Sequence, residues 1–165
     1  MTLLVCPLSK VESAAALYRP SHMVSLLSPS SPPESWPTPD GEHLRLAFHD
    51  IAAPRDGLVP PGGEQVAELL AFAARWDATR PLLVHCWAGV SRSTAAAFII
   101  ACQRAPGRSE AEIAGALRIA APYATPNPLL VALADETLGR GGRMIEAVAA
   151  IGRGAETFEG ALFEL

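Results

Sequence analysis

The stretch Pro81-Leu-Leu-Val-His85-Cys86-Trp87-Ala88-Gly89-Val90-Ser91-Arg92-Ser93-Thr94 joins three kinds of local sequence. Residues 81–85 are a largely apolar run that ends in a histidine, which is typical of a central strand covered on both faces. Residues 94–102 are apolar on every side and predict a buried helix that starts near Arg92 or Ser93. The stretch therefore predicts a buried strand, a short loop with one glycine and a buried helix in direct succession.

Short β-like runs alternate with helical ones along the rest of the chain. Besides residues 81–85, strands are expected over residues 2–6, 22–27 and 43–48. Helices are expected over residues 9–18, 64–76, 94–102, 109–121, 127–139 and 141–152, with capping boxes at Ser9/Glu12 and Ser109/Glu112. This alternation predicts an α/β fold with a central, mainly parallel sheet of about four or five strands flanked by helices.

The length of 165 residues is typical of one domain, and the sequence shows no internal repeat or second composition zone. A single domain over residues 1–165 is therefore expected. Residues 29–39 hold five prolines and three serines, and they predict a surface loop. Residues 50–63 are also rich in proline and glycine and predict a second loop.

Composition and charge exclude several classes of protein. Half of the residues are hydrophobic and 18% are charged, which excludes a disordered chain. The net charge of −4 gives no basic field that would hold nucleic acid. No apolar run reaches the roughly 18–20 residues that span a bilayer, so no membrane insertion is expected. Residues 1–10 do not resemble a signal peptide, and three cysteines form no disulfide framework, so a cytoplasmic location is expected.

The loop between the strand and the helix has the features of an anion site. A loop that enters a helix N-terminus turns backbone N–H groups toward one point, where the helix dipole adds positive charge. Arg92 can add a bidentate guanidinium that matches two oxygens of a phosphate. Cys86 at the entrance of this loop should ionise readily to the nucleophilic thiolate. Ser93 could donate a hydrogen bond to that thiolate.

The residues His85-Cys86-Trp87-Ala88-Gly89-Val90-Ser91-Arg92-Ser93 resemble the active-site signature of the cysteine-dependent protein tyrosine phosphatases. The likeness is closest to the compact dual-specificity type and to small bacterial enzymes. The family pattern is His-Cys, five residues, Arg, then Ser or Thr. Spacing alone is weak, because Cys102 and Arg108 are also separated by five residues, in a context without a preceding strand.

The resemblance implies hydrolysis of phosphate monoesters through a cysteinyl-phosphate, with no metal or organic cofactor. It makes Cys86 the nucleophile and His85 a residue that braces the loop. The phosphate would be held by the loop residues Trp87, Ala88, Gly89, Val90, Ser91 and Arg92.

The family also uses an aspartate upstream of the cysteine as general acid, because the leaving oxygen must receive a proton. Asp50 follows the strand expected over residues 43–48 and is the favoured candidate. Asp56 lies deeper in the same loop and is the alternative, whereas Asp40 comes before the strand and is too early. A turn aspartate that binds nearby backbone would look the same in sequence.

The segment from Arg118 to Pro126-Asn127 resembles a part of dual-specificity phosphatases that precedes a late helix near the active site. By this resemblance Asn127 could hold the active-site loop or the hydrolytic water. As an alternative, Asn127 is the N-cap of the helix that begins at Pro128.

Other reactive side chains receive structural interpretations. His22, His43 and His49 show no ligand spacing, so no metal site is expected. Cys102 is expected in the core. Cys6 could approach Cys86 in a parallel sheet and form a protective disulfide with it. Trp87 should either line the pocket or pack beneath it.

The favoured function is hydrolysis of protein phosphotyrosine, with dual specificity or a small phosphate monoester as further options. The loop has no lysine, which inositol-lipid phosphatases of the superfamily often place there. Three alternatives stay open: a phosphate-binding module without turnover, a rhodanese-like sulfur transferase, and an arsenate reductase with Cys6 as partner thiol. The sequence does not predict an oligomeric state.

Overall fold

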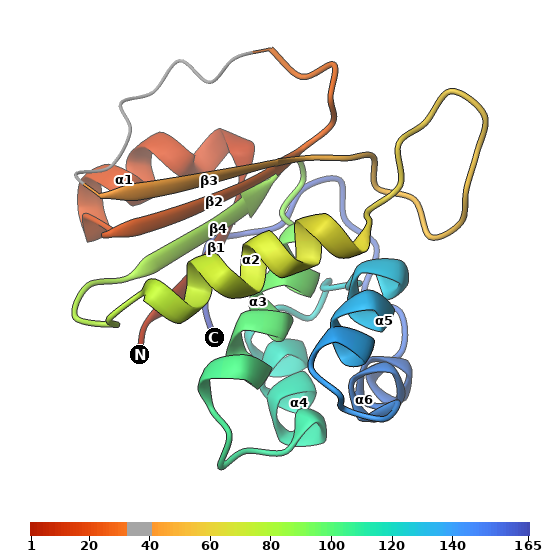
Figure 1. The fold of residues 1–165 in the computed structure, drawn as a ribbon. Coiled ribbons are helices and arrows are strands. Elements are labelled where there is room, and N and C mark those ends of the chain that lie inside the picture. The colour runs from red at the N-terminus through yellow and green to blue at the C-terminus, as the bar shows by residue number, and fades with distance from the viewer. Residues whose placement is uncertain (33–40) are drawn as a thin grey trace.

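A five-stranded sheet forms the centre of the computed structural model, which describes residues 1–32 and 41–165 (Figure 1). The strand order is β3-β2-β4-β1-β5. The strands are β1 (Leu3–Pro7), β2 (His22–Leu27), β3 (Glu42–Ala47), β4 (Leu82–Cys86) and β5 (Phe163–Glu164). The first four are parallel to one another, and β5 pairs antiparallel with β1. The predicted α/β fold with a mainly parallel sheet is therefore confirmed.

Helices cover both faces of this sheet. They are α1 (Val11–Tyr18), α2 (Gly63–Arg75), α3 (Arg92–Arg104), α4 (Glu110–Ala120), α5 (Pro128–Thr137) and α6 (Arg143–Ile151). Figure 1 shows α1 on one side of the sheet and the other five helices on the opposite side. In the described part of the chain, none of these helices combines the length and apolar character that a membrane crossing requires.

Two apolar clusters hold these layers together. A small cluster joins α1 to one face of the sheet and contains Leu4, Cys6, Val11, Ala14, Met23 and Leu83. A large cluster fills the space under α2 to α6 and includes every residue of α3 from Ala95 to Cys102. Helix α3 is thus buried all round, as its sequence predicts. Cys102 lies in this core, where burial raises the pKa of its thiol to about 12.

Two local predictions have opposite outcomes. The capping box at Ser109 is present, since the Ser109 hydroxyl accepts from the Glu112 amide at 3.2 Å. The capping box at Ser9 is wrong, because residues Leu8–Lys10 form a 3-10 turn and α1 starts only at Val11. The Ser9 hydroxyl instead donates to a carboxylate oxygen of Glu159 at 2.8 Å. A contact with a residue so distant in sequence leaves no local signal.

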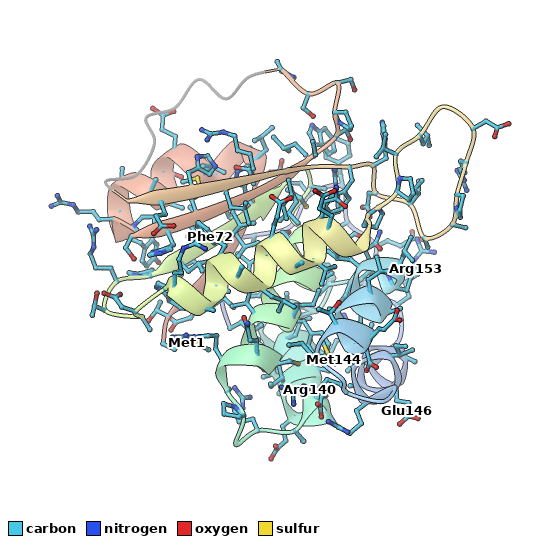
Figure 2. All side chains as sticks on the ribbon, viewed as in Figure 1. Met1, Phe72, Arg140, Met144, Glu146 and Arg153 are labelled. Carbon is cyan, nitrogen blue, oxygen red and sulfur yellow. The ribbon has the colours of Figure 1, made fainter. Side chains whose placement is uncertain are left out.

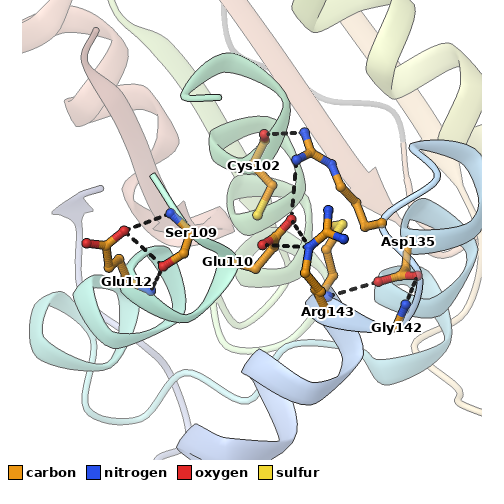
Figure 3. A network of polar contacts seen from close by, with 9 residues as sticks. Cys102, Ser109, Glu110, Glu112, Asp135, Gly142 and Arg143 are labelled. Atoms are coloured by element: carbon orange, nitrogen blue, oxygen red, sulfur yellow. Dashed lines mark hydrogen bonds and ion pairs between the residues drawn. The ribbon is translucent and has the colours of Figure 1, made fainter. Parts of the chain in front are cut away.

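A polar network fixes α6 against α4 and α5 (Figure 3). The buried carboxylate of Asp135 accepts from the amides of Gly142 and Met144 at 2.7 and 2.9 Å, and so binds the N-terminus of α6. Glu110 pairs with Arg143 and with Arg140, each at 3.3 Å. These contacts set the direction of α6, and with it the path of the segment that follows.

One of the two predicted loops lies only partly within the described residues. The proline-rich loop predicted over residues 29–39 is described only as far as Pro32, and Asp40 also lies outside the described residues. The second predicted loop runs from β3 to α2 and is largely exposed. It brings Asp50 close to the carboxyl end of β4, as the next section describes.

Candidate active site

The loop from Cys86 to Arg92 joins β4 to α3, and its carbonyl oxygens point outward. Four of them accept backbone hydrogen bonds from segments that are distant in sequence. In each bond a backbone amide donates to a loop carbonyl: Leu8 to Trp87 (3.0 Å), Gly160 to Ala88 (2.8 Å), Thr125 to Val90 (2.9 Å) and Asn127 to Ser91 (3.4 Å). Three different segments, around residues 8, 125–127 and 160, thus hold the outer side of one short loop.

The outward carbonyls determine where the loop amides point. In a trans peptide unit the N–H points away from the C=O, so an outward carbonyl places the next amide on the inner side. This applies to the amides of residues 88, 89, 91 and 92. The Gly89 amide does donate to the Cys86 Sγ at 3.3 Å. The loop therefore curves around the sulfur with its N–H groups facing inward, which is the arrangement that binds an oxyanion.

Gly89 is required at the closest approach of this loop to the sheet. Its φ is +71°, a region that side chains with a Cβ rarely adopt. A Cβ at this position would also lie 2.7 Å from the Pro7 nitrogen. The end of β1 thus supports the loop from below, and only glycine fits between them.

Cys86 lies at the bottom of the loop and is 2% exposed. Its Sγ is 3.2 Å from the Ser93 Oγ, so the predicted contact between these two side chains is present. When the sulfur is a thiolate, the hydroxyl must be the donor. The N-terminus of α3 adds its partial positive charge at the same place. The sulfur thus has a hydroxyl, a backbone amide and a helix N-terminus beside it.

Arg92 is the first residue of α3 and is buried. Its Nη1 donates to the Phe48 carbonyl at 2.9 Å and approaches the Ser28 Oγ at 3.4 Å. Its Nε is also buried and has no hydrogen-bond partner among the described residues. The ends of β2 and β3 thus hold one side of the guanidinium, and Nε is available to an anion in the loop.

Asp50 is tied directly to the loop. Its Oδ1 accepts from the Ser91 hydroxyl at 2.7 Å and from the Asn127 side-chain amide at 2.8 Å. Because both donors contact Oδ1, the proton of a neutral carboxyl group would sit on Oδ2. Asp56 is exposed in the outer part of the same loop. The geometry therefore favours Asp50 over Asp56 as a group that exchanges a proton in this site.

Asn127 is the N-cap of α5, as one of its two interpretations predicts, and its side chain also contacts Asp50. Its Oδ1 accepts from the Leu130 amide at 3.0 Å, which caps α5. Its Nδ2 donates to Asp50 at the same time. The helix cap therefore fixes the side chain that orients the carboxylate.

The other histidines do not reach the reacting atoms. His49 accepts from the Val59 amide at 2.9 Å and closes the base of the loop between β3 and α2. His85 lies behind the loop, where its Nε2 is 2.5 Å from the Ser25 Oγ. Within the described residues, no three His, Cys, Asp or Glu side chains gather as metal ligands would.

Cys6 lies on β1, next to the end of β4, but its side chain is on the opposite side of the sheet from that of Cys86. Cys6 pairs in register with His85, and successive residues of a strand face opposite sides of the sheet. The two thiols accordingly belong to different apolar clusters. Burial and the nearby Cys86 raise the pKa of Cys6 to about 12. The structure therefore does not support the predicted protective disulfide, which would require movement of the strand backbone.

A cleft of about 760 Å³ opens beside the loop. One side is lined by Asp50, Ser91 and Asn127, and the other by Arg153, Glu156 and Phe158. Figure 2 shows Arg153 at the same end of the molecule as the loop that follows β3. No local pattern in the sequence predicts that residues 153–158 line a cleft with Ser91, so this wall was missed.

Long-range hydrogen bonds hold that wall in place. Arg118 donates to the Gly152 carbonyl at 2.7 Å, and the Gly154 amide donates to the Thr125 hydroxyl at 3.1 Å. A Cβ on Gly154 would lie 2.3 Å from the backbone of Tyr123, so the chain passes very close there. Such contacts have no local sequence pattern, apart from the repeated glycines.

Trp87 lies on the rim of the site, which differs from both predicted placements. It is 53% exposed, and its ring meets that of Phe158 edge to face with centroids 5.5 Å apart. Phe158 is 81% exposed. The two rings form an exposed apolar ledge beside the loop, and such ledges often mark contact surfaces.

Comparisons with known proteins agree with this fold. A scan against protein-family models and a search of curated proteins find no match. Among solved structures, human DUSP28 is 22% identical with a TM-score of 0.60, and the alignment covers 90% of this chain and 94% of that one. A variant of human DUSP28 is 25% identical over 79% of this chain and 86% of that one, with a TM-score of 0.56. PTPMT1 in complex with PI(5)P is 18% identical over 90% and 93% of the two chains, with a TM-score of 0.62. The chain thus has the fold of the dual-specificity phosphatases.

The geometry of Gly89 generates a prediction about anion binding. Gly89→Ala should lower the affinity for tungstate, a tetrahedral oxyanion, by at least about tenfold, because the loop must move away from Pro7. Isothermal titration calorimetry measures this affinity. Gly107→Ala is the matched control, since a Cβ there meets nothing within 4 Å and its φ is not positive. Equal affinities for the two variants would contradict the described shape of the loop.

Proposed function

We propose that this protein is a phosphatase that hydrolyses phosphate monoesters through a cysteinyl-phosphate intermediate, with protein phosphotyrosine as its preferred substrate. The observation that carries the proposal is the Cys86 thiol inside a loop whose amides face inward. An adjacent buried guanidinium and a carboxyl group tied to the loop supply the other groups that the reaction needs. The similarity of the fold to dual-specificity phosphatases supports the same activity.

In the first step the Cys86 thiolate attacks phosphorus and forms the S–P bond while the P–O bond to the leaving group breaks. The leaving oxygen takes the electron pair of that bond and receives a proton from Asp50. The inward amides and Arg92 hold the equatorial oxygens, where negative charge gathers in the transition state. The hydrogen bonds from Ser91 and Asn127 keep Asp50 in position for this transfer.

In the second step water attacks the phosphorus of the cysteinyl-phosphate and the S–P bond breaks. Asp50, now a carboxylate, takes a proton from the water, and the sulfur leaves as a thiolate. The Ser93 hydroxyl, 3.2 Å from the sulfur, stabilises this leaving group. Neither step requires an oxidant or a reductant.

The alternative functions fit the site less well. A module that only binds phosphate has no need for a carboxyl group tied to the loop, as Asp50 is. A rhodanese-like transferase usually has an arginine soon after the cysteine, where this chain has Trp87 and Ala88. An arsenate reductase needs a partner thiol, and Cys6 faces the opposite side of the sheet from Cys86.

The cytoplasmic location stays a prediction from the sequence.

The cleft favours a phosphoprotein over a polyanionic lipid head group. Arg153 is the cation that lines it, and this side chain is 3.9 Å from the carboxylate of Glu156. Asp50 adds another negative charge, so the cleft offers little attraction for further phosphates. Trp87 and Phe158 instead offer apolar surface to an aromatic or aliphatic side chain. PTPMT1, in contrast, has been crystallised with PI(5)P.

Cys86→Ser should abolish hydrolysis of an aryl phosphate, because an alcohol at this position ionises far less readily than a thiol. Tungstate binding should persist within about threefold of the wild type, since the amides and Arg92 are unchanged. Phosphate release and calorimetry measure the two properties. Retained turnover would show that Cys86 is not the nucleophile.

Asp50→Asn should lower the rate of aryl-phosphate hydrolysis by about 10²–10⁴-fold for poor leaving groups, the range typical of general acid catalysis. The loss should shrink as the leaving group becomes more acidic, because a better leaving group needs no proton. A series of substituted aryl phosphates measures this dependence. Asp56→Asn, in the exposed part of the same loop, should match the wild type. If Asp56→Asn shows the loss instead, Asp56 is the general acid.

The substrate class is tested by comparing matched peptides that carry phosphotyrosine or phosphothreonine with a soluble phosphoinositide head group. The highest kcat/KM is expected for the phosphotyrosine peptide. Phe158→Ala should raise KM for that peptide by about 3- to 10-fold, as loss of an apolar contact does. Ile119→Ala is the control, since Ile119 is an equally exposed apolar residue on α4. Preferred hydrolysis of the head group would overturn the proposed substrate.

A further inference from the structure

A chain of three polar side chains lies behind the active-site loop. The Ser25 Oγ is 2.5 Å from the Nε2 of His85 and 2.7 Å from the Nε2 of His43. Ser25 and His85 are buried, with exposures of 2% and 0%, whereas His43 is half-buried. The chain therefore leads from near the protein surface to the residue that precedes Cys86.

The three side chains come from three adjacent strands and share one face of the sheet. Ser25 on β2 pairs in register with His85 on β4, and His43 on β3 pairs with Met23. This is the face that α1 covers, opposite to the face of the Cys86 thiol. The contact is thus built into the strand register, so any change at Ser25 affects both imidazoles.

Counting protons shows that the two imidazoles are coupled. The Ser25 hydroxyl has a single proton, so it can donate to only one of the two nitrogens. The other nitrogen must then donate to the Ser25 oxygen. At least one of His43 and His85 therefore carries a proton on Nε2 in every arrangement of this chain. When one ring accepts from the Ser25 hydroxyl, the other ring must therefore donate to it, which sets its tautomer.

We propose that Ser25 and His43 are positioning residues that fix the orientation and the proton of His85, and through it favour the thiolate form of Cys86. His85 is adjacent to Cys86, so its ring sets the direction of the peptide at which the loop begins. A ring held in one orientation keeps the loop amides in place around the sulfur, where they stabilise a negative charge. The role in turnover rests on the proposed phosphatase function, whereas the effect on thiol ionisation does not.

The other groups on this face do not replace the chain. On β1, Cys6 pairs with His85, and its pKa of about 12 keeps it neutral near pH 7. On β3, Arg45 pairs in register with Ser25, and its side chain is exposed. Helix α1 contributes the apolar side chains of Val11 and Ala14.

The test is the pH dependence of Cys86 alkylation by iodoacetamide, followed by mass spectrometry of the full chain. The pKa values of Cys6 and Cys102 are both raised to about 12, so alkylation between pH 5 and pH 9 reports on Cys86. Ser25→Ala should move the alkylation midpoint upward by about 0.5–1 pH unit and slow the reaction at pH 6 by about 3- to 10-fold. His43→Asn should shift it in the same direction by a smaller amount.

Two controls separate this effect from a loss of packing. Ser25→Thr keeps the hydroxyl on a β-branched side chain suited to a strand, so it should restore the wild-type midpoint. Ser21→Ala removes a similar buried contact, the 3.0 Å pair between Ser21 and His22, at the opposite end of β2. It should lower the melting temperature without moving the alkylation midpoint.

An unchanged midpoint in Ser25→Ala would overturn the proposal. A shift in Ser25→Ala without one in His43→Asn would remove His43 from the chain. If Ser25→Ala does not fold, His43→Asn decides the question, because His43 is only half-buried. The wild-type protein could be alkylated at Cys86 and yet not hydrolyse aryl phosphates. This result would refute the proposed function, but the comparison of alkylation midpoints between the variants would remain valid.

Discussion

The candidate site depends on the outward direction of four carbonyl groups in the loop from Cys86 to Arg92. Amides converge on one point only if the carbonyls of the same peptide planes are bound elsewhere, since a buried carbonyl without a partner is costly. Here the partners come from the turn after β1, from the segment of residues 125–127, and from Gly160. The loop also has local contacts, such as those of Thr94 with the Val90 and Ser91 carbonyls, but its outer side is held by distant parts of the fold. This explains why a short motif can work only inside a large, well-packed domain.

The charged side chains of the site are also held by residues outside the loop. Arg92 is held by the Phe48 carbonyl at the end of β3, and Asp50 by Ser91 and Asn127. Each of these two side chains thus has its orientation set by another element. Such preorganised charges act more strongly than mobile ones, because little reorganisation is needed when negative charge develops. Asn127 makes both kinds of contact, since its one side-chain amide group caps helix α5 and also contacts the Asp50 carboxylate.

The sequence predicts well those features that depend on neighbouring residues. The four parallel strands lie within about two residues of their predicted positions, as do most helix ends, because hydrophobic periodicity and caps are local signals. The signal that identifies Cys86, Arg92 and Ser93 is also local, because the strand, the loop and the helix follow one another directly in the sequence. Strand β5 was missed because it has only two residues and pairs through a long-range contact. The choice between Asp50 and Asp56 needed the path of their loop, and the wall formed by residues 153–158 needed contacts with residues 118–125.

The hydrogen bond from Gly160 to Ala88 has a consequence for the newly made protein. On the ribosome, Cys86 leaves the exit tunnel long before Gly160 is synthesised. During that interval the strands and helices of the first half can form, but the loop lacks one of its outer supports. A nascent chain therefore carries the Cys86 thiol in a loop that lacks this contact. Completion of the C-terminal segment turns this thiol into part of a finished site, so chemical competence arises late in biosynthesis.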